Sequence, residues 1–231
     1  MRWAGTLLVF LVALLAIHLP QGLGGVSDDE DWSFGQSAEV CLLQSLFRSE
    51  AGSDGWRVVG RKGEEDPAGF LGLEYEHRAL RASDSAPALP WYFDGSGAGL
   101  SRDLVGAYNG QLRFKLWHPE QPPEGTELAE PQGEGEPDVV IETLCGFEVT
   151  LAGVLRASRL PQRYAVVLHE EAESWIDSRT SRRITSTAML EALSNVRSVR
   201  IRGGLLRGPE GARLSEVRLV PPSPSHPCLT L

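Results

Sequence analysis

The sequence is poor in cysteine and in long hydrophobic runs. It has three cysteines in 231 residues, and its longest apolar run, residues 6–17, lies near the N-terminus. That run is shorter than the roughly 20 residues that an α-helix needs to span a bilayer. No later segment approaches this length. We therefore expect no membrane span in the chain once the N-terminal segment is removed.

The sequence also lacks the motifs of common catalytic and nucleotide-binding sites. It contains no GxSxG, no P-loop and no strand–GxGxxG–helix unit. The glycines at 95, 97 and 99 precede no predicted helix, so they do not support a dinucleotide site. The pair His169-Glu170 could begin a zinc motif, but Glu173 stands where HExxH requires a second histidine. We predict a non-enzyme with no catalytic residue, metal or cofactor, and a secreted hydrolase is the least favoured alternative.

The N-terminus resembles a secretory signal. Arg2 precedes the apolar run, and the small residues Gly22–Gly25 precede acidic sequence. We predict a signal peptide over residues 1–25, an acidic disordered lead over 26–39, and a secreted, extracellular protein. An uncleaved N-terminal anchor is the alternative.

Charge is unevenly distributed along the chain. The formal net charge is −9, with 9 basic and 24 acidic residues over 26–150, against 12 and 7 over 151–231. An acidic protein repels nucleic acid as a whole, so we expect no nucleic acid partner. The arginine-rich C-terminal part could form a local patch for an anionic polysaccharide. Arginines on solvated strand faces are the simpler interpretation, which we favour.

Strict alternation near residue 112 indicates a half-buried strand. Apolar residues at 112, 114 and 116 alternate with polar residues at 111, 113 and 115, after a turn at Asn109-Gly110. Trp91–Phe93 precedes this strand across a glycine-rich loop.

The rest of the chain predicts about nine short strands and one helix. The first core element is expected over Cys41–Phe47. The strand predictions are Trp56–Gly60, Phe70–Tyr75, Trp91–Phe93, Leu112–Trp117, Val139–Ile141, Phe147–Leu151, Tyr164–Leu168, Val199–Ile201 and Leu214–Leu219. The helix is expected over Ser186–Asn195, capped by Ser186 or Thr187. Residues 76–90 are expected to be a surface excursion, and 119–137 a mobile acidic insertion, where a calcium site is the less favoured alternative. This pattern predicts an all-β, two-sheet sandwich.

Two kinds of side chain suggest specific pairings or contacts. Cys41 lies near the first strand and Cys228 beyond the last, so a Cys41–Cys228 disulfide would close nearly the whole domain. That pairing would leave Cys145, at the tip of a hairpin predicted at Leu144-Cys145-Gly146, as the odd thiol. The alternatives are Cys41–Cys145 or an intermolecular bond through the odd thiol. Trp91, Tyr92 and Trp175 are candidates for stacking on a glycan, although aromatic side chains in a sandwich more often pack in the core.

The order of motifs resembles the laminin IV type A domain, also called the laminin B domain, over about residues 45–220. The matching segments are Gly55–Gly60, Trp91–Phe93, Leu100–Phe114, Asp138–Glu142 with Gly146, Tyr164–Trp175, Met189–Asn195, Val199–Gly203 and Leu214–Leu219. The chain departs from the family pattern at Gly95-Ser96, at Gly99–Ser101 and in the acidic insertion. These departures concern the loops rather than the strands. The resemblance also implies that Trp91–Phe93 is the entry strand of the sandwich, with the strand of Leu112, Phe114 and Leu116 as its partner.

The resemblance implies a jelly-roll β-sandwich similar to carbohydrate-binding modules, over residues 40–220 with a Pro/Ser tail at 221–231. It implies a secreted, stand-alone, non-enzymatic interaction or matrix module whose partner is an extracellular protein or glycan. The alternative function is a carbohydrate-binding module that uses aromatic side chains at the loop rim. The identity of the ligand and the oligomeric state are left open.

Overall fold

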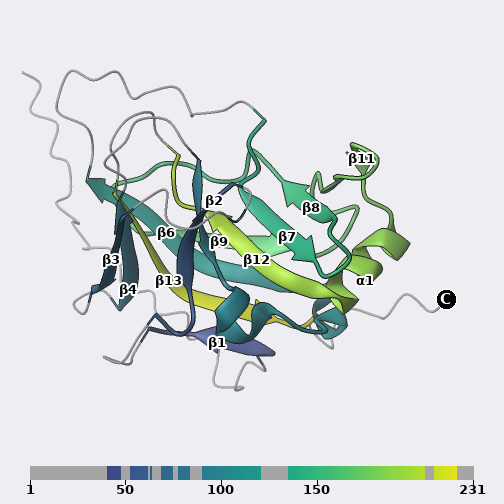
Figure 1. Ribbon diagram of the computed structural model, residues 1–231, viewed down its shortest axis with the longest axis horizontal. Helices are drawn as coiled ribbons and strands as arrows, with labels where there is room; N and C mark the ends of the chain where they lie inside the picture. The colour runs from purple at the N-terminus through teal and green to yellow at the C-terminus, as the bar shows by residue number, and fades with distance from the viewer. Residues whose placement is uncertain are drawn as a thin grey trace, which may run out of the picture. The chain divides into compact units, whose positions relative to one another are not determined.

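Strands with alternating apolar side chains are divided between two antiparallel sheets in this computed structural model (Figure 1). The structure describes residues 41–47, 53–61, 63, 69–74, 78–83, 90–120, 135–205 and 211–222. All of them lie in one compact unit, Glu39–Leu231. The predicted signal, the acidic lead, most of the acidic insertion and most of the Pro/Ser tail lie outside the described residues.

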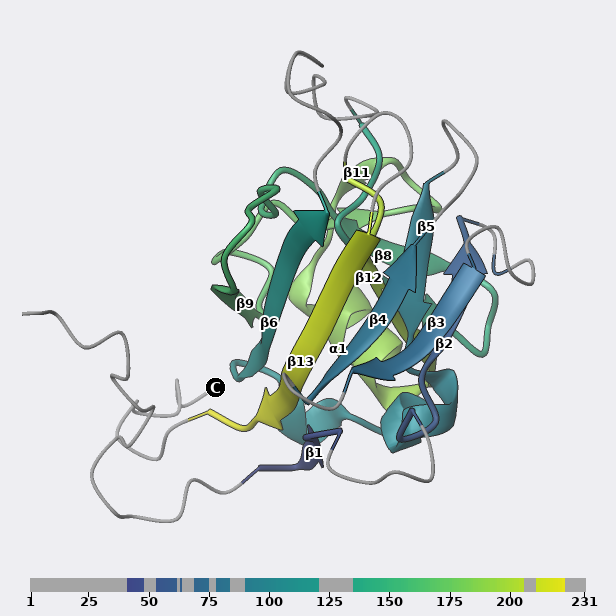
Figure 2. The ribbon, with the colours of Figure 1, turned by 90° about the vertical axis from the view of Figure 1, so that its left-hand side faces the viewer.

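One sheet has six strands in the order β3-β4-β13-β6-β9, with β1 also paired to β13. Figure 2 shows β9, β6, β13, β4 and β3 side by side. The strands are β1 (Leu43–Ser45), β3 (Gly69–Glu74), β4 (Ala79–Ser83), β6 (Gln111–Glu120), β9 (Gln162–Val167) and β13 (Gly211–Val220).

The second sheet has seven strands in the order β11-β10-β8-β7-β12-β5-β2. The strands are β2 (Arg57–Gly60), β5 (Trp91–Asp94), β7 (Val139–Thr143), β8 (Glu148–Leu151), β10 (Ile176–Asp177), β11 (Arg182–Arg183) and β12 (Val196–Arg202). The two inner faces enclose one hydrophobic core, so the predicted all-β, jelly-roll-type sandwich is confirmed.

The segment from Trp91 to Leu116 crosses from one sheet to the other. Strand β5 pairs with β2 and β12, whereas β6 pairs with β13 and β9. The expectation that these two strands are partners is therefore wrong. Two helical turns, η1 (Ser96–Leu100) and η2 (Val105–Ala107), lie between them. This connection is longer than the two- to five-residue loops typical of hairpins, and it carries the chain across the core.

One strand falls where the sequence predicted a surface excursion. Strand β4 lies inside residues 76–90 and is hydrogen-bonded between β3 and β13. Its buried residues are Ala79, Leu80 and Ala82. Alanine has low β-propensity, and only one large apolar side chain marks the strand, so its sequence signal is weak.

The single helix, α1 (Ser186–Ser194), confirms the predicted helix, with a different cap. The Thr185 side chain accepts a hydrogen bond from Ala188 N at 3.3 Å, so Thr185 is the N-cap rather than Ser186 or Thr187. The helix buries Ala188, Met189, Ala192 and Leu193. No helix in the described part of the chain is long and apolar enough to cross a membrane.

Candidate functional site

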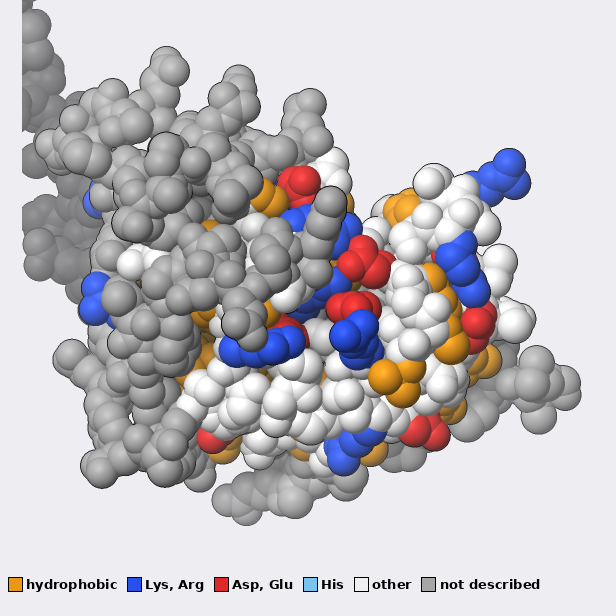
Figure 3. Space-filling model, in the orientation of Figure 1, with side chains coloured by type: hydrophobic (Ala, Val, Ile, Leu, Met, Phe, Trp, Pro, Cys, Tyr) orange, Lys and Arg blue, Asp and Glu red, His pale blue; other side chains and the backbone are white. Residues whose placement is uncertain are grey.

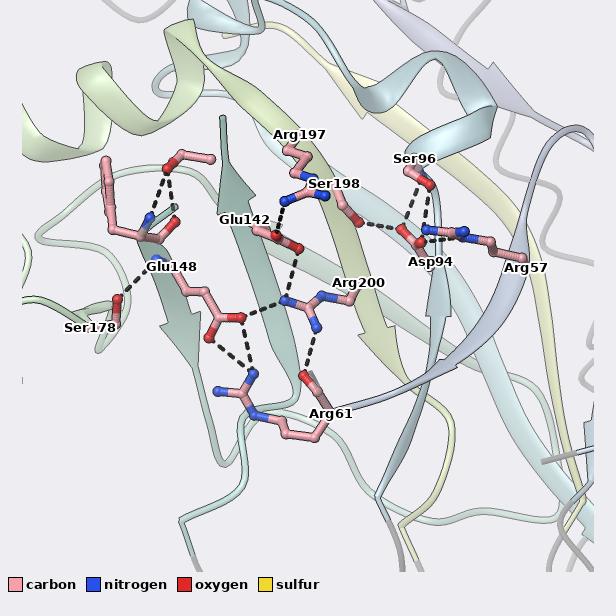
Figure 4. A network of polar contacts seen from close by, with 12 residues as sticks. Arg57, Arg61, Asp94, Ser96, Glu142, Glu148, Ser178, Arg197, Ser198 and Arg200 are labelled. Atoms are coloured by element: carbon pink, nitrogen blue, oxygen red, sulfur yellow. Dashed lines mark hydrogen bonds and ion pairs between the residues drawn. The ribbon is translucent and has the colours of Figure 1, made fainter. Parts of the chain in front are cut away.

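The outer face of the seven-stranded sheet carries an extended network of arginine and acidic side chains (Figure 3). Alternate residues of a strand point to opposite faces. Val199 and Ile201 of β12 face the core, so Ser198 and Arg200 point outward. Figure 4 shows these side chains meeting acidic residues from β5, β7 and β8.

Arg200 is at the centre of this network, and its side chain is only 2% exposed. Its Nη2 atom lies 2.5 Å from Glu148 Oε1 and 3.3 Å from Glu142 Oε2. Its Nη1 atom donates a hydrogen bond to the backbone oxygen of Arg61 at 2.6 Å. Because a buried guanidinium loses its hydration, these contacts are needed to keep the charge in place. The Nε atom of Arg200 has no hydrogen-bond partner among the described residues.

The partners of Arg200 are held by further ion pairs. The Arg61 side chain donates from Nη1 to Glu148 Oε2 at 3.0 Å, and its Nε atom lies 3.5 Å from Glu136. Arg197 Nη1 donates to Glu142 Oε1 at 3.1 Å. Glu142 and Glu148 therefore each bind two arginines, which fixes the positions of both carboxylates.

Asp94 anchors the β2 end of the network. It accepts hydrogen bonds from Arg57 Nε at 2.7 Å, from the backbone N and Oγ of Ser96 at 3.0 Å each, and from Ser198 Oγ. Burial opposes ionisation, but the hydrogen bonds from Ser198, Arg57 and Ser96 outweigh it and hold the pKa of Asp94 below its usual value. Because donors already occupy both of its oxygens, Asp94 is suited to a structural role rather than to proton transfer.

The network is balanced in charge. Ion pairs join five arginines to five carboxylates: Arg57, Arg61, Arg197, Arg200 and Arg202 to Asp94, Glu136, Asp138, Glu142 and Glu148. A face of this kind has little net attraction for an ion. It offers instead a rigid pattern of donors and acceptors that a protein surface could match.

The three aromatic side chains predicted to stack on a glycan are buried. Trp91, Tyr92 and Trp175 are each 0% exposed. Trp91 packs edge-on against Phe93 with ring centroids 5.3 Å apart. The Tyr92 hydroxyl donates to Pro137 O at 2.9 Å, and Trp175 Nε1 donates to Val167 O at 3.0 Å. None presents a ring face to solvent, so the predicted stacking platform is wrong.

The His169-Glu170 segment follows β9 and forms a polar cluster. The Tyr108 hydroxyl donates to Glu170 Oε2 at 2.8 Å, and its ring lies 5.5 Å from that of His169. Burial and the Glu170 carboxylate raise the pKa of Tyr108 to about 12. The segment ends at buried Trp175, as expected for a polar strand end. Among the described residues, no group of three or more His, Cys, Asp or Glu is placed to hold a metal ion.

The glycine-rich loop is used for close backbone packing. Gly55 has a φ of +82°, and a Cβ atom placed on it would lie 2.1 Å from Gly97 O. A Cβ on Gly97 would lie 2.4 Å from Gly55 O. The two glycine motifs therefore meet in space, which their separation in the sequence did not reveal.

The described cysteines do not test the predicted disulfide. Cys145 is exposed at the tip of the turn between β7 and β8, where the sequence predicted a hairpin. Cys41 is half-buried, and Cys228 lies outside the described residues. The Cys41–Cys228 pairing stays a prediction.

Comparison with known proteins places this fold among extracellular modules. The family model of laminin B (domain IV) matches residues 101–227. The L4b domain of human laminin alpha-2 is similar in structure, with a TM-score of 0.57 and 13% sequence identity over 80% of this chain and 99% of that chain. At this identity the structural likeness shows the fold alone. No curated protein matches the sequence.

Proposed function

Because this chain belongs to the laminin B (domain IV) family of extracellular-matrix modules, we propose that it is a secreted, non-enzymatic module that binds an extracellular partner through its sheet faces. Domains of this family are structural and non-catalytic. We propose both that this chain is not catalytic and that it is secreted.

The observation that carries the proposal is that the residues of the family-like motifs hold the scaffold together. Trp91 and Trp175 fill the core. Asp138 Oδ2 accepts hydrogen bonds from Val154 N at 2.7 Å and Leu155 N at 2.9 Å, and so holds the connection that follows β8. These contacts and the Tyr108–Glu170 hydrogen bond support the interpretation that the motif residues determine the fold and do not form a reactive centre.

In a scaffold of this kind, a partner would be recognised by the outer surfaces. On the seven-stranded sheet, Arg61, Glu142 and Glu148 keep side-chain exposures of 28%, 23% and 22% while their ion pairs hold them in place. Side chains that are already ordered lose little conformational entropy when a partner binds. This supports the charge-balanced face as a protein-binding surface.

The test uses the full chain expressed in cultured mammalian cells. We expect the protein in the medium and saturable binding to an immobilised basement-membrane extract. The double variant Arg61→Ser/Glu142→Ser should weaken that binding at least tenfold. The matched control Arg182→Ser/Glu171→Ser, which also removes one basic and one acidic side chain at exposed positions, should change it less than twofold.

Two results would overturn the proposal. The first is retention of the chain inside the cells under conditions where a secreted control protein is exported. The second is turnover of a polysaccharide or ester substrate by the purified protein that is abolished by changing one acidic residue or histidine.

A further inference from the structure

On the charge-balanced face, two arginines are far more exposed than the carboxylates that they bind. The side chains of Arg57 and Arg197 are 55% and 63% exposed, whereas those of their partners Asp94 and Glu142 are 3% and 23% exposed. Each pair therefore turns its positive group toward solvent and its negative group toward the sheet. The balance of the network in formal charge does not extend to its outermost side chains.

Both arginines keep N–H donors that their ion pairs do not use. Arg57 contacts Asp94 through Nε at 2.7 Å, and Arg197 contacts Glu142 through Nη1 at 3.1 Å. Among the described residues, the two Nη atoms of Arg57 and the Nε and Nη2 atoms of Arg197 have no hydrogen-bond partner. A guanidinium presents its N–H groups as a planar fork that matches the two oxygens of a carboxylate. Each side chain can therefore bind a second carboxylate without breaking its own ion pair.

Strand pairing fixes the distance between the two arginines. Arg57 of β2 lies level with Arg200 of β12, because both are paired with Asp94 of the intervening strand β5. Arg197 lies three residues before Arg200, at a shift of register that lets both Arg197 and Ser198 reach the outer face. Two steps of about 4.8 Å between strands and three of about 3.3 Å along β12 separate the two Cα atoms by about 14 Å. The two guanidinium groups are therefore separate contact points on one face.

The carboxylates of the same face oppose a uniformly negative partner. The side chains of Glu136, Glu142 and Glu148 are 36%, 23% and 22% exposed. A sulfated polysaccharide carries charge along its whole length, so it would meet these carboxylates as well as the arginines, and like charges repel. A protein surface can place acidic side chains opposite Arg57 and Arg197 and neutral groups opposite the glutamates. The pattern of charge favours a protein over a polyanion.

We propose that the charge-balanced face binds an acidic patch of an extracellular protein, with one carboxylate side chain of the partner on Arg57 and another on Arg197. This inference rests on the proposed function, which assigns the face to an extracellular protein, and it adds the chemistry of that partner. The chain as a whole is acidic, with a formal net charge of −9. Its distant acidic residues repel the partner only weakly, because at physiological ionic strength charges more than about 8 Å apart are largely screened.

The first test measures binding of the full chain to immobilised basement-membrane extract by biolayer interferometry. The variant Arg57→Gln/Arg197→Gln should bind at least tenfold more weakly. It should still fold, because exposed ion pairs contribute little to stability and Ser96 and Ser198 still donate to Asp94. The matched control Arg159→Gln/Arg182→Gln also removes two exposed arginines and should change the apparent Kd less than twofold.

The second test changes the extract instead of the chain. Carbodiimide coupling of glycinamide neutralises the carboxylates of the extract, whereas coupling of taurine replaces each of them with a sulfonate and keeps the negative charge. Glycinamide treatment should weaken binding at least tenfold, and taurine treatment should weaken it clearly less. Digestion of the extract with heparinase removes sulfated glycans and should change binding less than twofold.

The third test uses no variant and so does not depend on how well the variants fold. Phenylglyoxal modifies exposed arginine side chains, and mass spectrometry of the digested chain locates the modified residues. Binding to the immobilised extract should slow modification of Arg57 and Arg197 at least fivefold. Modification of Arg159 and Arg182, which are exposed in the free chain, should slow less than twofold.

Three results would overturn the inference. They are an equal effect of the two double variants, an equal loss of binding after glycinamide and taurine treatment, and equal modification of Arg57 and Arg197 in the bound and free chain. Loss of binding after heparinase digestion would assign the face to a sulfated glycan instead. If Arg61→Ser/Glu142→Ser weakens binding while Arg57→Gln/Arg197→Gln does not, the proposed function stands and this inference alone is wrong. If the unchanged chain does not bind the extract, both are wrong.

Discussion

Gly203 lies directly against the indole ring of Trp91. The backbone N atoms of Gly203 and Gly204 donate to Trp91 O at 2.9 and 3.2 Å, and a Cβ atom on Gly203 would lie 2.0 Å from Trp91 Cζ3. This contact joins the end of β12 to the start of β5 and positions one of the largest fully buried side chains of the core.

The variant Gly203→Ala should therefore be destabilised by overpacking. Because the added Cβ atom would overlap a fully buried indole ring, we expect a loss of about 1–3 kcal/mol in the free energy of unfolding. Urea denaturation followed by tryptophan fluorescence measures this loss. Gly106→Ala is the control, since a Cβ atom there would lie 3.6 Å from Leu42 in ordinary contact. Equal midpoints for the two variants would show that the close contact is not a constraint.

Removing the central guanidinium of the charge-balanced face should be costly. The variant Arg200→Met leaves Glu142 and Glu148 without their buried partner, and we expect a loss of about 3 kcal/mol in the free energy of unfolding. Arg197→Met removes an arginine whose side chain is 63% exposed and should cost less than about 1 kcal/mol. Denaturation at low and high salt distinguishes the two, because salt screens the exposed pair more than the buried one. Similar losses in the two variants would contradict a special role for Arg200.

Stability should fall when the pH is lowered below neutrality, in part because of His118. Burial lowers the pKa of His118 below its usual value of 6.5, and the hydrogen bond to Gly203 O at 2.9 Å opposes this shift only partly. The unfolded chain therefore takes up a proton near pH 6.5 that the folded chain does not, so acidification favours unfolding in the window below about pH 6.5.

The variant His118→Gln can donate to the same carbonyl but cannot titrate. Its free energy of unfolding should fall less steeply from pH 7 to pH 5 than that of the unchanged chain, whose excess slope is at most about 1.4 kcal/mol per pH unit. Parallel pH profiles for the unchanged chain and His118→Gln would refute this assignment. Asp94 does not contribute in this window, because its lowered pKa removes stability only at more acidic pH.

The thiol at Cys145 should react in the folded protein. It is exposed at the turn between β7 and β8, and the predicted Cys41–Cys228 disulfide would leave it as the odd cysteine. Iodoacetamide should add a single label under native conditions, and peptide mapping should locate it on Cys145. Reduction and unfolding should then expose two further thiols. A native label on Cys41 or Cys228 would instead support a different pairing.

Several elements of the fold could be predicted because their signals are local. The alternation of β6 depends only on neighbouring side chains, and the turn at Leu144-Cys145-Gly146 closes the β7–β8 hairpin as expected. The helix was found as well, although its cap lies at Thr185. Strand β4 was missed because Ala79 and Ala82 give little strand signal, and its place in the sheet depends on pairing with β3 and β13 on either side.

The candidate surfaces depended on contacts that the sequence does not show. Alternation separates Arg200 from the apolar positions of β12, but it could not show that Glu142 and Glu148 would meet it. Likewise, the sequence favoured core packing for Trp91 and Trp175 and left a ligand platform as the alternative, and only their burial decided between the two.

The sequence by itself determined which side chains of each strand share a face, because the period of a β-strand is a property of its own backbone. Only the tertiary structure decided which strands are neighbours and in what register, since hydrogen-bond pairing between distant segments depends on how the whole core packs. The balanced network around Arg200 arises from that register.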